Sequence, residues 1–175
     1  MCGRFSLTSP IESVRRLFSL SQLPNLGPRY NIAPTQEIAA VRLMEGSGAR
    51  ELVMLRWGLV PSWAKDLKFS LNTINARAET ISEKPSFREA YRFRRCLIPA
   101  EGYYEWVTTE NGRQPFRICR KDGQTFGFAG LWEAWKNPSD GSELQSCTIV
   151  VGEAGPRVKN IHHRMPVIVK QNDFA

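Results

Sequence analysis

The sequence contains few residues of the kinds that hold metal ions. Its 175 residues include two histidines and four cysteines. The cysteines form no C-x-x-C pair, and His162 and His163 are adjacent rather than one helical turn apart. Because structural zinc sites need ligands at short, regular spacings, we expect no metal and no other cofactor.

Long apolar segments and a secretory signal are also missing. No apolar run approaches the roughly 18 residues of a membrane span, and the first residues lack the apolar core of a signal peptide. We therefore expect a cytoplasmic protein with reduced thiols and no membrane contact, near the nucleoid if the source is bacterial. The P-loop, the G-x-G-x-x-G loop, the G-x-S-x-G elbow and the H-E-x-x-H motif do not occur either.

Acidic residues are in the minority. The 24 lysines and arginines outnumber 17 aspartates and glutamates, which gives a net charge of +7 and a pI near 9.5. Such a charge favours a polyanionic partner such as nucleic acid. The length and a hydrophobic content of 42% predict one globular domain over residues 1–175, which we expect to be monomeric.

Capping patterns predict two short helices. Ser9 suits an N-cap, Pro10 the first helical position and Glu12 the closing of a capping box, so a helix is expected to run to about Leu20. A second helix is expected to begin at Ser86. Its capping partner would be Glu89, and its inward-facing residues would be Phe87, Ala90 and Tyr91.

Strand patterns cover most of the remaining chain. A loop rich in proline, glycine and asparagine is expected at 21–36, and a hairpin turn at Asn111-Gly112. The expected strands cover residues 37–44, 51–60, 96–106, 115–120, 126–135, 144–151 and 167–170. Many short strands and few helices predict an α+β fold, built on a mainly antiparallel, curved, barrel-like sheet with short flanking helices.

The N-terminus carries a reactive pattern. If Met1 is removed, Cys2 presents an amine and a thiol on neighbouring carbons. Such a 1,2-aminothiol condenses with an aldehyde to an imine, and attack by the sulfur then closes a stable thiazolidine ring. Ordinary pKa values of about 8 for the amine and about 8.5 for the thiol leave both partly available at neutral pH, and Arg4 is expected to favour the thiolate. The alternative is that a cysteine stands at position 2 by chance.

Three further polar residues are candidates for catalysis. Glu105 stands between two aromatic residues, so burial could raise its pKa, although alternate strand positions also commonly face solvent. Asn75 lies in a polar stretch without helical periodicity. His162 is the third candidate, because histidine is the side chain that ordinarily changes charge near neutral pH.

Arginines and tryptophans are candidates for nucleic-acid contacts. The arginines would bind phosphates and the tryptophans would stack on bases, with ordinary surface charge and core packing as the alternatives. The candidates are Arg4, Arg77, Arg164, Trp57, Trp63 and Trp106.

Seven motifs in order along the chain give it a specific resemblance. They are Met1–Phe5, Tyr30–Thr35, Arg56–Trp63, Asn75–Thr80, Arg95–Trp106, Ala129–Trp132 and Ile161–Pro166. Together they resemble the SRAP family, the SOS-response-associated peptidase-like, abasic site processing proteins.

The resemblance implies a protein that shields abasic sites in single-stranded DNA during the DNA damage response through a covalent, lyase-like crosslinking reaction. Cys2 would form the thiazolidine with the C1′ aldehyde, and Asn75 would orient the N-terminus and the sugar. Glu105 would shuttle protons, and His162 would assist proton transfer, including crosslink reversal. Arg4 and Arg77 would grip the phosphates beside the lesion.

Family members usually continue beyond the motif that ends at Pro166, whereas this chain stops at Ala175. We therefore expect a single SRAP-like domain that is truncated at its C-terminus.

Two other functions stay open. One is a thiol peptidase with Cys2 as nucleophile and autoproteolytic removal of Met1 as its mildest form. The other is a simple single-strand-binding module.

Overall fold

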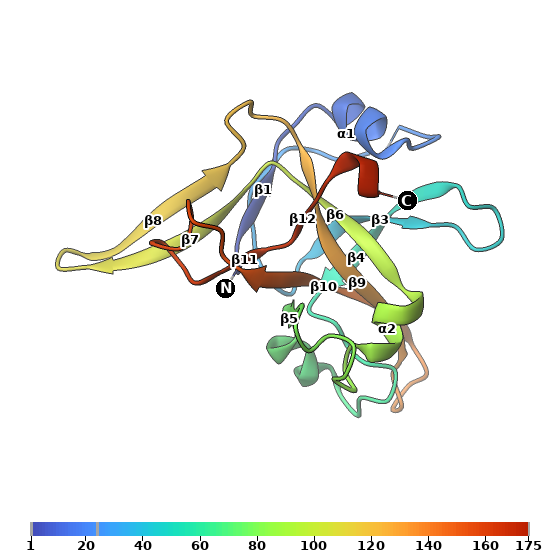
Figure 1. Ribbon diagram of the computed structural model, residues 1–175. Coiled ribbons are helices and arrows are strands. Elements are labelled where there is room, and N and C mark those ends of the chain that lie inside the picture. The colour runs from blue at the N-terminus through green and yellow to red at the C-terminus, as the bar shows by residue number, and fades with distance from the viewer. Residues whose placement is uncertain (1, 24, 175) are drawn as a thin grey trace.

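The computed structural model describes residues 2–23 and 25–174, and β-sheet makes up most of it (Figure 1). The smaller sheet has the order β2 (Arg29–Ile32), β1 (Phe5–Leu7), β7 (Gly102–Thr109), β8 (Gly112–Cys119). The larger sheet has the order β11 (Arg164–Pro166), β10 (Glu143–Glu153), β4 (Arg50–Trp57), β3 (Glu37–Leu43), β6 (Arg95–Ala100), β9 (Phe126–Lys136), β12 (Ile168–Val169), with β5 (Asn75–Arg77) on β10. The helical elements are α1 (Ile11–Phe18), α2 (Arg88–Phe93) and the 3₁₀ turns η1 (Leu67–Asn72) and η2 (Gln171–Asp173).

The larger sheet closes into a barrel. Strand β10 pairs with β4 on one side and with β9 on the other, so β10, β4, β3, β6 and β9 form a ring. Every pairing in the ring is antiparallel except β4 with β10, which is parallel. The predicted α+β fold with a curved, barrel-like sheet is therefore confirmed. Closure satisfies the backbone hydrogen bonds that an open sheet would leave at its edges.

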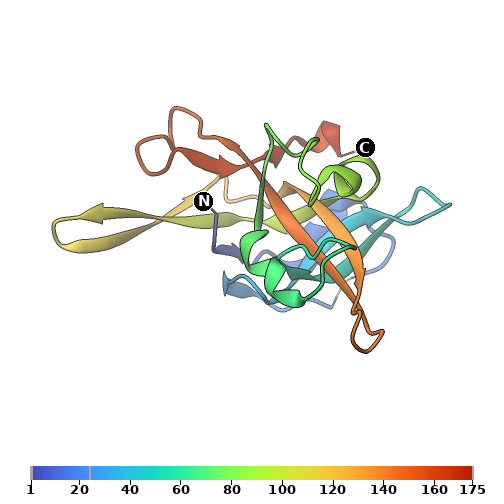
Figure 2. The ribbon, with the colours of Figure 1, turned by 90° about the horizontal axis from the view of Figure 1, so that it is seen from below.

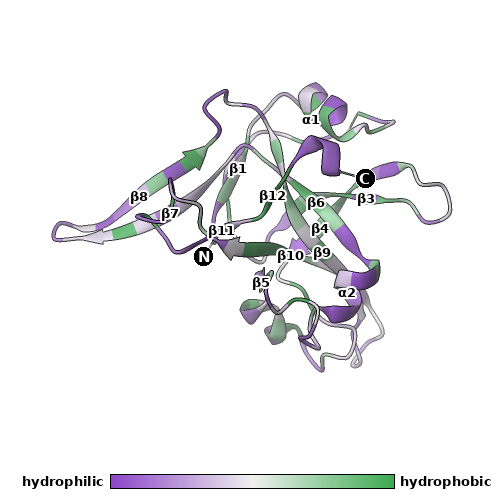
Figure 3. Ribbon diagram, in the orientation of Figure 1, coloured by the Kyte–Doolittle hydropathy of each residue, from purple (hydrophilic) through white to green (hydrophobic). Residues whose placement is uncertain are grey.

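The two sheets share one apolar core. Phe5 of β1 packs edge-to-face on Trp57 of β4 and on Phe128 of β9, with ring centroids 5.3 and 6.0 Å apart. Figure 3 shows apolar residues along β10 and polar residues on outer elements such as α2 and η2. The core therefore continues from the barrel into the base of the smaller sheet, while hairpin β7–β8 extends away from the barrel (Figures 1 and 2).

The predicted first helix exists, but its cap is different. Pro10 occupies the N-cap position and no side chain caps the helix. The Ser9 hydroxyl instead donates to the Glu101 carboxylate (2.8 Å), and Glu12 binds Arg15 and Arg16 of the same helix. The capping-box prediction was wrong because these side chains find better partners within the fold.

The predicted second helix is also present, starting at Arg88 without a side-chain cap from Ser86. Phe87 and Ala90 are buried, as expected. Tyr91 is 43% exposed, so its predicted inward orientation was wrong.

Most predicted strands are confirmed, with corrections at their ends. The strand expected at 51–60 stops at Trp57, because Gly58 has φ +122 and a Cβ there would lie 2.6 Å from the Ser70 carbonyl oxygen. The strand expected at 96–106 is two strands, β6 and β7, that belong to different sheets and meet at Glu101. The loop at 21–36 contains β2, and the strand expected at 167–170 is reduced to β12.

Within the described residues no helix is long and apolar enough to span a membrane.

Candidate active site

Strand β1 carries the N-terminal segment to the base of β7. Phe5 pairs with Tyr103, and the Tyr104 amide donates to the Arg4 carbonyl at 2.9 Å. Continuing this antiparallel pairing brings Cys2 to the neighbourhood of Glu105. The Cys2 side chain is 0% exposed and belongs to the barrel core, and its Sγ lies 3.9 Å from the Arg4 carbonyl oxygen.

Asn75 holds the chain at residue 2. It lies on β5, which runs parallel to β10 with Asn75 opposite Ile149. Its Nδ2 donates to the Cys2 carbonyl at 2.9 Å, whereas its buried Oδ1 has no hydrogen-bond partner among the residues that the structure describes. The amide therefore fixes the backbone of Cys2 and keeps one acceptor beside it.

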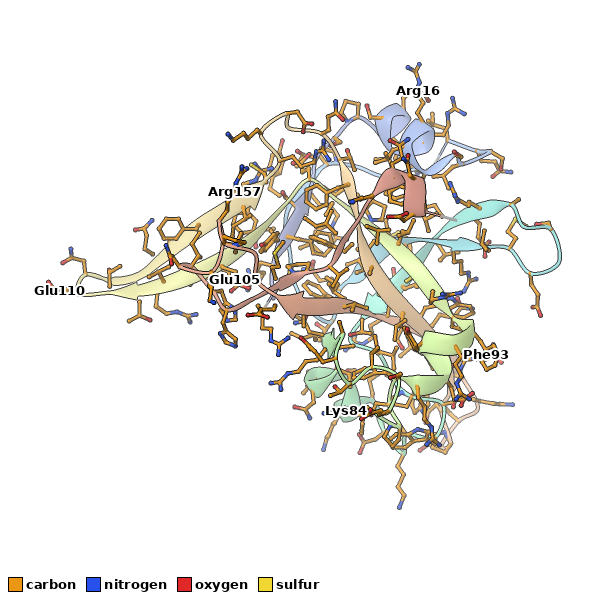
Figure 4. All side chains as sticks on the ribbon, in the orientation of Figure 1. Arg16, Lys84, Phe93, Glu105, Glu110 and Arg157 are labelled. Carbon is orange, nitrogen blue, oxygen red and sulfur yellow. The ribbon has the colours of Figure 1, made fainter. Side chains whose placement is uncertain are left out.

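Glu105 points into the protein. It is 4% exposed and shares the buried face of β7 with Tyr103, while Tyr104 and Trp106 alternate onto the other face. Figure 4 shows Glu105 at the barrel end of the hairpin and Glu110 at its tip. The alternative that this glutamate faces solvent is therefore wrong.

The Cys2 thiol is held in its protonated form. Burial raises its pKa far above the ordinary value, and the negative charge of Glu105 raises it further. The prediction that the Arg4 cation favours the thiolate was wrong. The Arg4 guanidinium is directed to the Asn31 side chain, and its Nη1 donates to Oδ1 at 2.9 Å. The thiol therefore needs a base before it can act as a nucleophile.

His162 lies just before β11, which pairs with β10 on the side opposite to the β5 position. Its Nδ1 accepts from the Arg164 amide at 2.9 Å, and its ring stacks on His163 with centroids 4.4 Å apart. Figures 1 and 2 both show the chain ahead of β1 beside β11. Cys2, Asn75, Glu105 and His162 thus come from segments that surround one end of β10.

Two of the predicted phosphate contacts flank the same end of β10. Arg77 is exposed and lies opposite Val151, and the same Val151 pairs with Pro166 of β11. Arg164 forms an ion pair with Glu79. A hydrogen bond from its own backbone and the Arg164 ion pair hold the pKa of Glu79 below its ordinary value. Arg77 therefore presents its charge to solvent more openly than Arg164 does.

The tryptophans are placed differently. Trp63 is 55% exposed, packs edge-to-face on Phe69 at 5.2 Å and donates from Nε1 to the Pro85 carbonyl at 3.4 Å. Trp57 is buried in the core, so it cannot stack on a base. Trp106 is half-buried, with the Arg113 guanidinium 5.9 Å from the centre of its ring.

Sequence reasoning did not single out Tyr103, which shares the buried face of β7 with Glu105, or Glu101, which lies at the corner between β6 and β7. Tyr103 is fully buried, and Glu101 accepts hydrogen bonds from Thr8, Ser9 and Arg117. The alternation along β7 was the available signal for Tyr103, because residues two apart on a strand share a face.

Within the described part of the chain, no three His, Cys, Asp or Glu side chains gather into a group that could hold a metal ion.

Comparison with known proteins gives consistent relatives. The family model of the SOS response associated peptidases (SRAP) matches residues 1–175. The abasic site processing protein YoqW of Bacillus subtilis (strain 168) is 45% identical over 97% of this chain and 76% of its own length. The abasic site processing protein HMCES of Pongo abelii is 30% identical over 97% of this chain and 61% of its own length.

The fold has solved counterparts as well. The crystal structure of a protein from Bacteroides thetaiotaomicron superimposes with a TM-score of 0.86 at 26% identity, covering 99% of this chain and 79% of that protein. The family model extends over the whole chain, and the motifs that it spans contain Cys2, Asn75, Glu105 and His162. The chain therefore belongs to the SOS response associated peptidase (SRAP) family.

Proposed function

We propose that this protein processes abasic sites in single-stranded DNA by bonding Cys2 covalently to the aldehyde of the ring-opened deoxyribose. One observation carries the proposal: the residue with both nucleophiles is buried, tied by Asn75 and placed beside the Glu105 carboxylate. The relatives named abasic site processing proteins support it. The activity is that of a DNA–protein crosslinking, lyase-like enzyme.

The first step is attack of the Cys2 α-amine on the C1′ aldehyde. The amine is free after removal of Met1, which lies outside the described residues. Addition gives a carbinolamine, and loss of its hydroxyl with one proton as water leaves the imine. The Glu105 carboxylate takes the proton that the nitrogen loses and passes it to the departing oxygen, while the Asn75 amide holds the Cys2 backbone in place.

The second step is ring closure. The Cys2 sulfur attacks the imine carbon, a C–S bond forms, the π pair of the C=N bond becomes a nitrogen lone pair, and the thiol proton moves to that nitrogen. Because burial and Glu105 keep the pKa of the thiol high, the proton leaves only as the bond forms, and the carboxylate of Glu105 accepts it and passes it to the nitrogen. The product thiazolidine is sheltered from water.

His162 exchanges protons with the bound sugar, both when the crosslink forms and when it is reversed. The Arg164 amide occupies Nδ1, so protons are exchanged through Nε2. The hydrogen bond at Nδ1 keeps the orientation of the ring fixed during this exchange.

DNA is held mainly through its phosphates. Arg77 is exposed beside the site, Arg4 and Arg164 flank it, and Trp63 offers a stacking surface further along the strand. With a net charge of +7, binding is sequence-independent and weakens with salt. A single strand suits the reaction because no base pair has to open. The protein acts as a monomer in the cytoplasm, where chromosomal DNA is found in bacteria.

A thiol peptidase is the second candidate, favoured by the family description. Such an enzyme needs a thiolate, whereas burial and Glu105 raise the pKa of Cys2. Removal of Met1 by the protein itself is the mildest form of this activity. A version that keeps Met1, obtained by blocking methionine aminopeptidase during expression, would lose Met1 on incubation if the protein removes it autocatalytically.

The proposal is tested with methionine-processed protein and single-stranded DNA that carries one abasic site. We expect an adduct on a denaturing gel whose intact mass equals protein plus DNA minus one water. Cys2→Ser should give an adduct only when borohydride traps its imine, and undamaged DNA should give none. Failure of the processed wild type to form any adduct would refute the proposal.

A further inference from the structure

Tyr103 carries a buried hydroxyl that the fold does not use. Its side chain is fully buried, and its hydroxyl has no hydrogen-bond partner among the described residues. Leaving such a group without a partner costs stability, and a phenylalanine would fill the same volume without that cost. The position therefore points to a partner that appears during the reaction.

The backbone places the Tyr103 side chain on the same face of β7 as Glu105. Tyr103 pairs with Phe5 across the β1–β7 ladder, and it belongs to the same apolar cluster as Cys2. It lies two residues before Glu105 on the buried face of β7. Tyr104 lies on the other face, and its hydroxyl does have a hydrogen-bond partner: it donates to the Tyr30 carbonyl at 3.0 Å.

The phenol is suited to donate rather than accept. Burial raises the pKa of Tyr103, and the charges of Cys2 and Glu105 raise it further, so it stays protonated at neutral pH. A neutral O–H that faces a developing sulfur anion forms a charge-assisted hydrogen bond.

We propose that the Tyr103 hydroxyl donates a hydrogen bond to the Cys2 sulfur during ring closure, when the C–S bond forms and the thiol proton leaves. This rests on the proposed crosslinking function and deepens it. The hydroxyl keeps its own proton throughout. Its part is to stabilise the negative charge that passes through sulfur while Glu105 accepts the thiol proton and delivers it to nitrogen.

The test compares Tyr103→Phe with its matched neighbour Tyr104→Phe. Reaction with abasic single-stranded DNA is quenched over time with borohydride, which adds two hydrogens to an imine and none to a thiazolidine. Intact mass then separates the two steps. We expect Tyr103→Phe to form imine at the wild-type rate and to close the ring roughly 10-fold to 100-fold more slowly, as for loss of a hydrogen bond to a charged group. Tyr104→Phe should close the ring at the wild-type rate.

The melting temperature and the pH dependence of ring closure are two further measurements. Neither would change in the expected way if Tyr103 served only to pack the core. Because the Tyr103 hydroxyl has no hydrogen-bond partner among the described residues, Tyr103→Phe should melt at or above the wild-type temperature. Its ring-closure rate should rise at higher pH than that of the wild type. Equal ring-closure rates, an equal slowing of both steps, or unfolding of Tyr103→Phe would each overturn the inference. Absence of any adduct with the wild type would instead overturn the crosslinking function itself.

Discussion

Two buried glutamates four residues apart differ in how the protein treats their charge. Glu101 lies at the corner between β6 and β7 and is surrounded by donors: Thr8, Ser9 (2.8 Å) and Arg117 (3.2 Å). Burial alone would raise its pKa, but these hydrogen bonds hold the pKa of Glu101 below its ordinary value. Its carboxylate therefore stays charged and ties the start of α1 to the hairpin.

Glu105 directs its charge at reactive groups instead. The same negative charge contributes to the raised pKa values of the Cys2 thiol and the Tyr103 phenol, after the larger effect of burial. The comparison teaches that burial of a carboxylate does not by itself mark a reactive one. What matters is whether neighbouring groups neutralise its charge, as at Glu101, or whether its charge raises the pKa of neighbouring acids, as at Glu105.

Exchanging one carboxylate at a time should separate the two roles. Glu105→Gln keeps the shape but removes the base, so the crosslinking rate should fall by roughly 100-fold to 10,000-fold. Glu101→Gln should leave that rate within a few-fold of the wild type, because its carboxylate serves the fold. Adduct formation followed on denaturing gels measures both. Equal losses in the two variants would contradict the distinction.

Thiol labelling should report the influence of Glu105 directly. Because burial and Glu105 raise the pKa of Cys2, iodoacetamide at pH 8 should label Cys2 far more slowly than the exposed Cys119. Glu105→Gln removes the negative charge, lowers the thiol pKa and should speed labelling of Cys2 relative to the wild type. Peptide mapping after timed labelling resolves the two cysteines. Labelling of Cys2 as fast as Cys119 would show that the thiol is not held protonated.

Glu101 should show its role in the pH dependence of stability. Since its folded pKa is lowered, it stabilises the protein above the unfolded value of about 4.3, and this contribution is lost as the pH falls through the folded value. Glu101→Gln should therefore lower the free energy of unfolding by about 1–3 kcal/mol at pH 7. The difference from wild type in urea titrations should shrink below pH 4.5. A gap that persists into acid would point to packing rather than charge.

The smallest effect is expected at Arg117. Its side chain is 42% exposed, so water screens its ion pair with Glu101. Arg117→Gln should cost less than about 1 kcal/mol of unfolding free energy and leave the crosslinking rate unchanged. A double variant with Glu101→Gln measures the coupling between the two residues. A large coupling would mean that the arginine, rather than the hydroxyls, neutralises Glu101.

Much of the fold follows from local patterns. The alternating strands and the hairpin turn at Asn111-Gly112 predicted a barrel-like antiparallel sheet, because period and turn chemistry are local properties. The aminothiol at Cys2 could likewise be predicted from the sequence, since it depends on covalent structure alone.

Other features depend on contacts between distant residues. The break at Glu101 sends β6 and β7 into different sheets, and Ser9 leaves its expected cap to bind that carboxylate. Burial of Cys2, which reverses the expected ease of ionisation, follows from the pairing of β1 with β7. Local propensity carries no information on such long-range contacts, so the chemical state of the thiol could not be predicted.

The most direct test of the account is to locate the bonds in the adduct. Methionine-processed protein is reacted with abasic single-stranded DNA, the adduct is digested with protease and nuclease, and the N-terminal peptide is sequenced by mass spectrometry. If the thiazolidine forms, the sugar remnant is on Cys2, it resists borohydride, and the Cys2 thiol is no longer open to alkylation. A remnant on a lysine, or on Cys2 with its thiol still free, would contradict thiazolidine formation.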